Sequence, residues 1–293
     1  MSDSQFRPRR SCLYMPGANT RALEKARSLP ADMLVLDLED SVAPEGKAEA
    51  RATVCAAVKE GGYGHREVLI RCNDFASEWG REDLAAAIEA APDGIVLPKV
   101  STAEQVREVN RLLQEAGADI ALWAMIETPL AILNIQAIAA TAGDTHLRGF
   151  VVGTNDLAKE LGAQNDAQRS AFQVHLALTL TAARAYGLVA IDGVYNDFKN
   201  EEGLEQECLQ GRLLGFDGKS LIHPAQLATA NRIFAPESEA VQQAQAIVDA
   251  FALPENQAKG VIQVGGKMVE ILHLEQARRT LAIAESIADH QLD

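Results

Sequence analysis

Eight short apolar runs alternate with longer helical patterns along most of this chain, and this alternation constrains the fold more than any other feature. Most of the runs are apolar on both faces, as expected for strands of a parallel sheet that is covered on both sides. Several of the helical patterns end in glycine, the usual signal of a helix C-terminus. The runs cover residues 11–15, 33–38, 67–72, 94–99, 120–126, 149–153, 188–192 and 218–223.

A (β/α)8 barrel of the TIM type, an α/β fold, is what this alternation predicts. The length of 293 residues is normal for one such barrel, and a hydrophobic content of 47% provides a large core. An open doubly wound sheet is the alternative, but no G-x-G-x-x-G motif follows the first predicted strand.

The pattern changes after Pro224. Two helical segments lead to the sequence KGVIQVGGKMVEIL, in which apolar–polar stretches flank Gly265 and Gly266 and predict a hairpin. A last helical pattern follows. We therefore expect residues 1–235 to form the barrel, and residues 236–293 to form a helix–hairpin–helix appendage that acts as a lid or as an arm on a neighbouring subunit.

Charge and composition exclude several classes of protein. Lys and Arg number 27 against 41 Asp and Glu, a formal net charge of −14, which argues against binding nucleic acid or an anionic membrane. No apolar run approaches the roughly 18 residues of a membrane span, and the N-terminal stretch has no apolar signal core. The four cysteines form no C-x-x-C pair, so zinc and a disulfide framework are not expected. A soluble cytoplasmic protein is predicted.

In this fold the active site lies at the carboxyl ends of the strands, so the polar residues that end each strand are the candidates. Most of them are acidic, and two are cationic. They are Asp37, Glu39, Asp40, Arg71, Lys99, Glu127, Asp156 and Asp192.

Glu127 and Asp156 end neighbouring predicted strands, which lie about 4.8 Å apart, so their carboxylates can converge. Two convergent carboxylates repel each other unless they share a proton or hold a cation. Mg²⁺ takes one or two protein carboxylates and completes its shell with water and ligand oxygens. The alternative is that Thr128 and Pro129 merely start one helix, while Asn155 or Asp156 caps the next.

Arg71 is suited to hold a carboxylate or an enolate, because its guanidinium binds such groups through two parallel hydrogen bonds. A structural salt bridge to Glu39 or Asp40 is the alternative. Asp37 and Glu39 share one face of their strand, and we expect them to orient Arg71 and water.

Arg21 and Lys25 are four residues apart and share one face of the first predicted helix. They could bind phosphates, but a solvated surface is the simpler interpretation of the pair.

Taken together, these segments resemble the β subunit of citrate lyase and its relatives, the malyl-CoA and citramalyl-CoA lyases, in the HpcH/HpaI aldolase superfamily. The resemblance covers nearly the whole chain. The segments that carry it are RRSCLYMPGANTRALEKA, LVLDLEDSVAPEGKAEAR, IRCND, PKV, IETPLAIL, VVGTNDLA, AIDGVYNDFKNEEGL, GFDGKSLIHPAQ and KGVIQVGGKMVEIL.

The resemblance implies a Mg²⁺-dependent carbon–carbon lyase that cleaves or forms a 3-hydroxyacyl-CoA, such as citramalyl-CoA or malyl-CoA, with acetyl-CoA and a 2-oxo acid as products. It also implies a homotrimer or hexamer. Glu127 and Asp156 match the metal ligands of the family, and Arg71 matches its substrate-binding arginine. The positions that match contacts to the CoA thioester are Tyr14, Arg21, Lys25, Asp37, Glu39, Asp40, Ser220 and Leu221.

The acid/base of the family is an Asp in the C-terminal arm, donated by a neighbouring subunit. Here Glu270 stands at that position, and the proline that follows in the family is missing. Glutamate can transfer the same proton with one more methylene of reach, but a displacement of about 1 Å can change a rate about a hundredfold. Two other functions stay open. A class II pyruvate-type aldolase without CoA would share the barrel and the paired carboxylates, and Glu270 is the reason to consider a CoA-ester-binding component with weak or lost activity.

Overall fold

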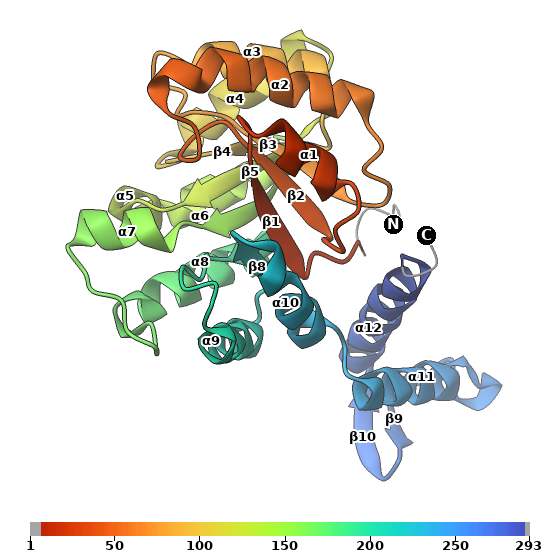
Figure 1. Cartoon of the computed structure of the whole chain (residues 1–293). Coiled ribbons are helices and arrows are strands. Elements are labelled where there is room, and N and C mark those ends of the chain that lie inside the picture. The colour runs from red at the N-terminus through yellow and green to blue at the C-terminus, as the bar shows by residue number, and fades with distance from the viewer. Residues whose placement is uncertain (1–6, 291–293) are drawn as a thin grey trace. The chain divides into compact units, whose positions relative to one another are not determined.

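Eight parallel strands close into a barrel in the computed structural model, which describes residues 7–290. Each strand pairs with the next in sequence, and β1 pairs with β8 to close the ring. This confirms the predicted TIM barrel, and Figure 1 shows the strands with helices around them. The strands are β1 (Ser11–Pro16), β2 (Met33–Asp37), β3 (Glu67–Arg71), β4 (Gly94–Leu97), β5 (Ala121–Ile126), β6 (Leu147–Val152), β7 (Val189–Asp192) and β8 (Gly218–Leu221).

Helices follow the strands of the barrel, as the sequence pattern predicts. They are α1 (Thr20–Ala26), α2 (Lys47–Glu60), α3 (Gly80–Ala90), α4 (Ala103–Glu115), α5 (Pro129–Leu133), α6 (Ile135–Ala140), α7 (Thr154–Leu161), α8 (Gln173–Ala185), α9 (Glu201–Leu214) and α10 (Leu227–Phe234). Short 3₁₀ turns are η2 (Pro44–Gly46), η3 (Thr141–Gly143), η4 (Ser170–Phe172) and η5 (Pro224–Gln226).

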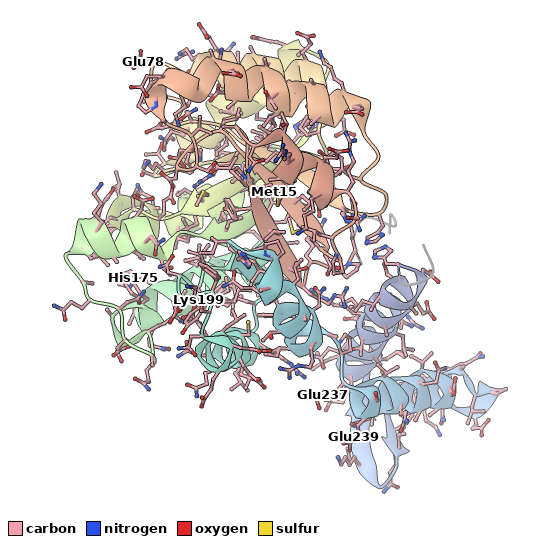
Figure 2. All side chains as sticks on the ribbon, in the orientation of Figure 1. Met15, Glu78, His175, Lys199, Glu237 and Glu239 are labelled. Atoms are coloured by element: carbon pink, nitrogen blue, oxygen red, sulfur yellow. The ribbon has the colours of Figure 1, made fainter. Side chains whose placement is uncertain are left out.

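Side chains along the strands divide into two buried clusters, because successive residues of a strand point to opposite faces. The larger cluster lies between the strands and helices and includes Leu34, Leu36 and Ile70. The smaller one contains alternate residues such as Val35 and Leu69, and it fills the barrel. Figure 2 shows the side chains along these elements. Both faces of the strands are thus buried, which explains their continuous apolar sequence.

The described chain divides into two compact units. One is the barrel, Arg9–Phe234. The other starts at Ala235 and contains α11 (Ser238–Ala252), η6 (Pro254–Asn256), β9 (Val261–Val264), β10 (Lys267–Glu270) and α12 (Ile271–Asp289). Arg7 and Pro8 are grouped with this second unit. Residues 1–6 and 291–293 of the two predicted domains lie outside the described residues.

The second unit has the predicted hairpin. Strands β9 and β10 are antiparallel, and Gly265 and Gly266 both adopt positive φ, at 55° and 81°, as a tight two-residue hairpin turn requires. A small apolar core that includes Ile247, Phe251 and Val269 joins the hairpin to α11 and α12. This unit therefore has its own buried centre, and its predicted role as a lid or an arm on a neighbouring subunit stays a prediction.

No helix within residues 7–290 is long and apolar enough to cross a membrane. Cys12, Cys55, Cys72 and Cys208 are buried and free.

Candidate active site

A cavity of about 400 Å³ opens at the carboxyl ends of the barrel strands. Its wall combines acidic groups, one arginine and several apolar side chains. This is the end of the barrel at which the sequence places the candidate residues. The lining residues are Tyr14, Met15, Pro16, Asp37, Asp40, Ser41, Arg71, Met125, Glu127, Val152, Gly153, Thr154, Asn155, Asp156, Val194, Ser220 and Ile222.

Arg71 and Asp37 form the central ion pair of this wall. They end β3 and β2 at paired register positions, and both side chains are buried. The Asp37 carboxylate accepts hydrogen bonds from Nε and Nη2 of Arg71, at 2.7 and 2.8 Å. Burial by itself would raise the pKa of Asp37, but the charge and hydrogen bonds of Arg71 outweigh it, and the pKa is lowered. Both groups are therefore charged.

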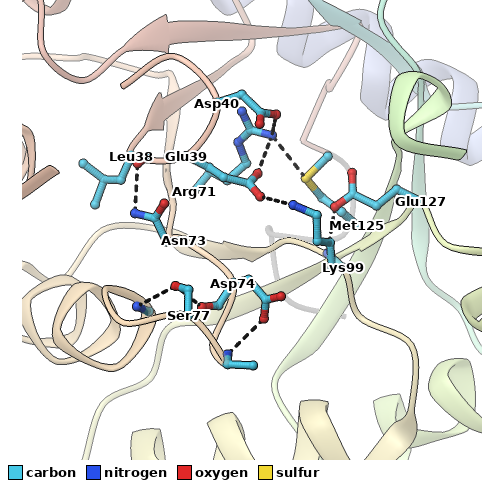
Figure 3. Close-up of polar contacts among 12 residues, drawn as sticks. Leu38, Glu39, Asp40, Arg71, Asn73, Asp74, Ser77, Lys99, Met125 and Glu127 are labelled. Atoms are coloured by element: carbon cyan, nitrogen blue, oxygen red, sulfur yellow. Dashed lines mark hydrogen bonds and ion pairs between the residues drawn. The ribbon is translucent and has the colours of Figure 1, made fainter. Parts of the chain in front are cut away.

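Two further carboxylates surround the remaining nitrogen of Arg71 (Figure 3). Nη1 lies 2.9 Å from Glu39 Oε2 and 3.1 Å from Asp40 Oδ2. The side chain of Asp40 is 65% exposed, whereas that of Glu39 is 8% exposed, so the Asp40 contact is the one that a ligand can displace. The salt bridges of Arg71 to Glu39 and Asp40, which are the alternative interpretation of this arginine, are present. Its main partner is Asp37, which that interpretation did not include.

Glu39 also accepts a hydrogen bond from Lys99 Nζ at 2.8 Å, on the side away from Arg71. Burial raises the pKa of Glu39 despite these two cationic neighbours. Asp37 and Glu39 thus both contact Arg71, and their predicted task of orienting Arg71 and water stays a prediction.

Glu127 follows β5 and is completely buried. Its Oε1 accepts a hydrogen bond of 2.7 Å from the backbone N–H of Lys99, while its Oε2 is buried without a hydrogen-bond partner. Burial, and secondly the charge of Glu39, raise the pKa of Glu127 to about 8. Gly153 makes room for the orphan oxygen, since a Cβ there would lie 2.2 Å from Oε2.

Asp156 lies in the first turn of α7, directly after β6, and it lines the same cavity as Glu127. The N-cap of α7 is Gly153, and no side chain caps this helix, so the alternative that Asn155 or Asp156 serves as its cap is wrong. Asn155 instead exchanges hydrogen bonds with Asn196. Thr128 does cap α5, as that alternative predicted for the preceding helix.

Tyr14 and Ser220 also line the cavity. The guanidinium carbon of Arg71 lies 5.0 Å from the centre of the Tyr14 ring, within the range of a cation–π contact. The Ser220 hydroxyl is buried without a partner. Leu221, which follows on β8, is fully buried in the core between strands and helices and does not line the cavity.

Three predicted site residues lie elsewhere. Arg21 and Lys25 are exposed on α1 and are not part of the cavity wall. Glu270 belongs to the other unit, where it is exposed at the end of β10 and forms the N-cap of α12. Its backbone N–H donates a hydrogen bond of 3.0 Å to Nδ1 of His273.

Two residues at strand ends behave differently from the expectation. Lys99 is part of the polar network although the sequence predicts no specific role for it, and its position two residues after the end of β4 is the signal that identifies it. Asp192 ends β7 but is not in the cavity wall, because it pairs with Arg169 at 2.7 Å and Lys219 at 3.3 Å among fully buried groups.

The donor set of the cavity fits a hard divalent cation. A buried carboxylate oxygen without a hydrogen bond is costly unless a cation or a proton occupies the position beside it. Among residues 7–290, no three Asp, Glu, His or Cys side chains converge into a complete metal cage. A cation held by Glu127 and Asp156 would therefore take its other ligands from water and substrate, as Mg²⁺ usually does.

A barrel with paired carboxylates and a buried arginine in a cavity at its carboxyl end has the arrangement of an α/β-barrel enzyme active site. Comparison with known proteins specifies the family. The model of the HpcH/HpaI aldolase/citrate lyase family matches residues 10–224, and the chain belongs to this family. The predicted resemblance is thereby confirmed, as is the predicted enzyme class of carbon–carbon lyases at the level of the family.

Similar proteins carry more than one activity in their names. A (3S)-malyl-CoA thioesterase of Cereibacter sphaeroides is 50% identical over 284 residues, which are 97% of each chain. The citrate lyase subunit beta of Escherichia coli is 36% identical over 292 residues, 97% of this chain and 96% of that protein. A crystal structure of CitE from Mycobacterium tuberculosis in complex with magnesium, acetoacetate and coenzyme A is 28% identical with a TM-score of 0.74, covering 95% and 98% of the two chains.

Proposed function

We propose that this protein is a Mg²⁺-dependent lyase that cleaves or forms the carbon–carbon bond of a 3-hydroxyacyl-CoA such as malyl-CoA or citramalyl-CoA. The products of cleavage are acetyl-CoA and a 2-oxo acid. The observation that carries the proposal is the orphan oxygen of Glu127, which is buried in one cavity with Asp156 and Arg71. The magnesium and coenzyme A in the similar CitE structure support the assignment of both groups.

Glu127 and Asp156 would hold the Mg²⁺. When bound, the ion polarises the oxygens of the 2-oxo acid half and neutralises the charge of the two carboxylates. Lys99 keeps Glu127 in its orientation by the hydrogen bond to Oε1, so Oε2 faces the cavity.

The N-terminus of α7 is suited to bind the carboxylate of the 2-oxo acid. Thr154 and Asn155 line the cavity, and no side chain caps this helix end, so its backbone N–H groups are available to an anion. This contact would fix the acid half of the substrate beside Asp156.

Arg71 is placed to stabilise the negative charge that develops on the thioester oxygen when the carbon–carbon bond breaks. Asp37 holds the guanidinium at two nitrogens, and Glu39 contacts the third, Nη1, so Nη1 can meet the substrate at the position that the exposed Asp40 carboxylate would leave. Because both Arg71 and Asp37 are buried, little reorganisation is needed for this contact.

Glu270 is our candidate for the acid/base that protonates the acetyl-CoA enolate in cleavage or removes the methyl proton in synthesis. In cleavage, the proton that the 3-hydroxyl loses as its carbon becomes the carbonyl of the 2-oxo acid is released to water. We propose that a neighbouring subunit of a homotrimer or hexamer supplies it. The apolar side chains beside it support a contact surface, since Met268, Ile271 and Leu272 are 73%, 51% and 54% exposed. Arg21 and Lys25, exposed on α1, are candidates to bind the phosphates of CoA.

Hydrolysis of the thioester is a second candidate function, and the 50% identity with a (3S)-malyl-CoA thioesterase favours it. The same cavity would bind the substrate, but water would attack the thioester carbon, and the products would be malate and free CoA. The carbon–carbon bond would then stay intact, and no enolate would have to be protonated.

One assay separates the two reactions. The purified protein is incubated with Mg²⁺ and (3S)-malyl-CoA, and acetyl-CoA, glyoxylate and free thiol are followed together. A lyase produces acetyl-CoA and glyoxylate in equal amounts, whereas a thioesterase releases free thiol without glyoxylate. (S)-Citramalyl-CoA is the second substrate, with pyruvate as the expected keto acid. The absence of any product from both substrates, with Mg²⁺ bound, would overturn both functions.

The CoA-free aldolase and the inactive binding component are tested separately. A thermal-shift comparison of CoA esters with free 2-oxo acids distinguishes the aldolase, which would respond to the acids alone. For the inactive component, Glu270→Asp would create an activity that the natural chain does not have.

A further inference from the structure

We propose that Lys99 is a positioning residue that sets the balance between cation binding and anion binding in this cavity. The proposal rests on the proposed function, because it assumes that Glu127 holds a divalent cation and that Arg71 faces an anionic substrate. Lys99 would act in two ways, through its backbone on Glu127 and through its ammonium group on Glu39.

The backbone of Lys99 has an unusual conformation. Its φ angle is 52°, in the left-handed region that residues other than glycine rarely adopt. In this conformation its N–H donates to Glu127 Oε1 at 2.7 Å. Such conformations persist only where the surrounding structure holds them, and they concentrate at functional sites. Here the unusual backbone orients the carboxylate whose other oxygen is left for the cation.

The ammonium group of Lys99 belongs to a chain of charges that ends at Arg71. Nζ donates to Glu39 Oε1 at 2.8 Å, and Glu39 Oε2 lies 2.9 Å from Arg71 Nη1. Three carboxylates, those of Asp37, Glu39 and Asp40, are thus matched by two cations. The buried Lys47 ammonium lies nearby but donates to the backbone carbonyls of Leu38 and Glu39. Without Lys99, Arg71 would be left as their ion-pair partner, and the surroundings of the cavity would be one charge more negative.

This excess negative charge would act on the two ligands with opposite signs. A divalent cation at Glu127 and Asp156 would bind more tightly, and an anionic substrate beside Arg71 would bind more weakly. In addition, Glu39 would lose one of its two cationic partners and draw Arg71 toward itself. A lysine with a purely structural role would behave differently, because its loss would loosen the site and weaken both ligands.

The test compares three variants of Lys99 in the full-length protein. Lys99→Met removes the charge but keeps an aliphatic chain, Lys99→Arg keeps the charge, and Lys99→Gly removes the charge while it permits the left-handed backbone. Mg²⁺ binding is measured by calorimetry without substrate, and glyoxylate binding is measured by calorimetry at saturating Mg²⁺. Lys59→Met is the matched control, since Lys59 pairs with Glu89 at 2.6 Å on the exposed surface of α2 and α3.

We expect Lys99→Met and Lys99→Gly to bind Mg²⁺ about three- to tenfold more tightly and glyoxylate at least about threefold more weakly than the natural protein. Lys99→Arg and Lys59→Met should differ from the natural protein by less than about twofold in both measurements. The proposal is overturned if both variants without the charge weaken both ligands, or if neither ligand responds. Lys99→Gly keeps the test valid if Lys99→Met fails to fold.

A failure of the proposal for Lys99 can be distinguished from a failure of the proposed function. If the natural protein binds Mg²⁺ and glyoxylate but turns over no CoA ester, the proposed reaction fails while opposite shifts at Lys99 still support this proposal. If the natural protein is active and the variants without the charge bind both ligands normally, only the role of Lys99 is overturned. A natural protein that binds no Mg²⁺ contradicts both.

Discussion

Asp37 and Arg71 occupy paired positions at the ends of β2 and β3, and the carboxylate accepts two hydrogen bonds from the guanidinium, at 2.7 and 2.8 Å. The alternation of side chains between the two faces of each strand produces this pair. Val35 and Leu69 lie two residues earlier and point into the barrel, so Asp37 and Arg71 point in the same direction at its mouth. The pair therefore joins the packed interior of the barrel to the wall of the cavity.

Replacing Asp37 by Asn should impair both activity and stability. An amide cannot match the charge of the buried Arg71, and its single acceptor oxygen cannot replace both hydrogen bonds. We expect kcat/KM to fall about a hundredfold and the free energy of unfolding to fall by about 3 kcal/mol. Steady-state kinetics and urea unfolding measure these effects. Glu78→Gln removes the same charge from an exposed side chain and should change neither quantity measurably.

The affinity for Mg²⁺ should depend on the protonation of Glu127. Because burial raises the pKa of this carboxyl to about 8, Mg²⁺ must displace a proton at lower pH. The apparent affinity should rise by up to about tenfold per pH unit between pH 6 and 8 and level off above that range. Calorimetry at several pH values, with proton release followed in buffers of different ionisation enthalpy, measures this slope.

The same pKa has a consequence for stability without metal. A raised carboxyl pKa means that the folded chain favours the protonated form, so this stabilisation is complete below about pH 4.5 and is lost as the pH rises through about 8. The loss is at most about 5 kcal/mol. Glu127→Gln should remove this contribution to the pH dependence and most of the Mg²⁺ affinity. An unchanged slope in that variant would show that another group titrates.

Gly153→Ala should disrupt the cation site. A Cβ at this position would lie 2.2 Å from Glu127 Oε2 and 2.5 Å from Glu127 Cβ, so the carboxylate would be displaced and the backbone after β5 and β6 would also have to move apart. We expect Mg²⁺ affinity to fall at least about tenfold, because one carboxylate ligand is displaced. Gly143→Ala is the control, since nothing lies within 4 Å of a Cβ there. Equal Mg²⁺ binding by the two variants would argue against Glu127 as a ligand.

Glu270 offers a test of subunit exchange. If a neighbouring subunit donates this carboxylate, a Glu270→Ala subunit and a Glu127→Gln subunit can complement each other, because one keeps the metal ligand and the other keeps the acid/base. Each variant alone should lose at least about a hundredfold in kcat. Co-expression of the two variants should restore a fraction of the activity. Without recovery in a confirmed mixed oligomer, Glu270 would have to act within its own chain or not at all.

The order and type of the elements could be read from local sequence. All eight predicted strands are present, and so is the hairpin around Gly265 and Gly266. These features depend on residues that are close together in the sequence. The spacing of apolar residues and the glycines at turns therefore specify them. In a TIM barrel the active site lies at the carboxyl ends of the strands, which predicts one common location for the strand-end residues. Four of them line the same cavity: Asp37, Arg71, Glu127 and Asp156.

The partners of those side chains could not be read in the same way. The sequence predicts no specific role for Lys99, yet its backbone and its ammonium contact two different carboxylates. The sequence also groups Asp192 with the other strand ends, whereas this residue pairs with Lys219 away from the cavity. A shift of one residue in a short strand reverses the face that a side chain occupies, and only the register of the closed barrel fixes that choice.

The sequence by itself determined the barrel, the appended hairpin and the strand ends that carry acidic groups, because these follow from periodicity along the chain. Only the tertiary structure decided which carboxylate oxygen is left without a hydrogen bond. Glu127 has that property because Lys99 turns its N–H toward one oxygen and Gly153 leaves space beside the other. These three residues follow β4, β5 and β6, and Gly153 directly precedes α7. Residues so far apart in the sequence are brought together by the packing of the barrel and not by any local pattern.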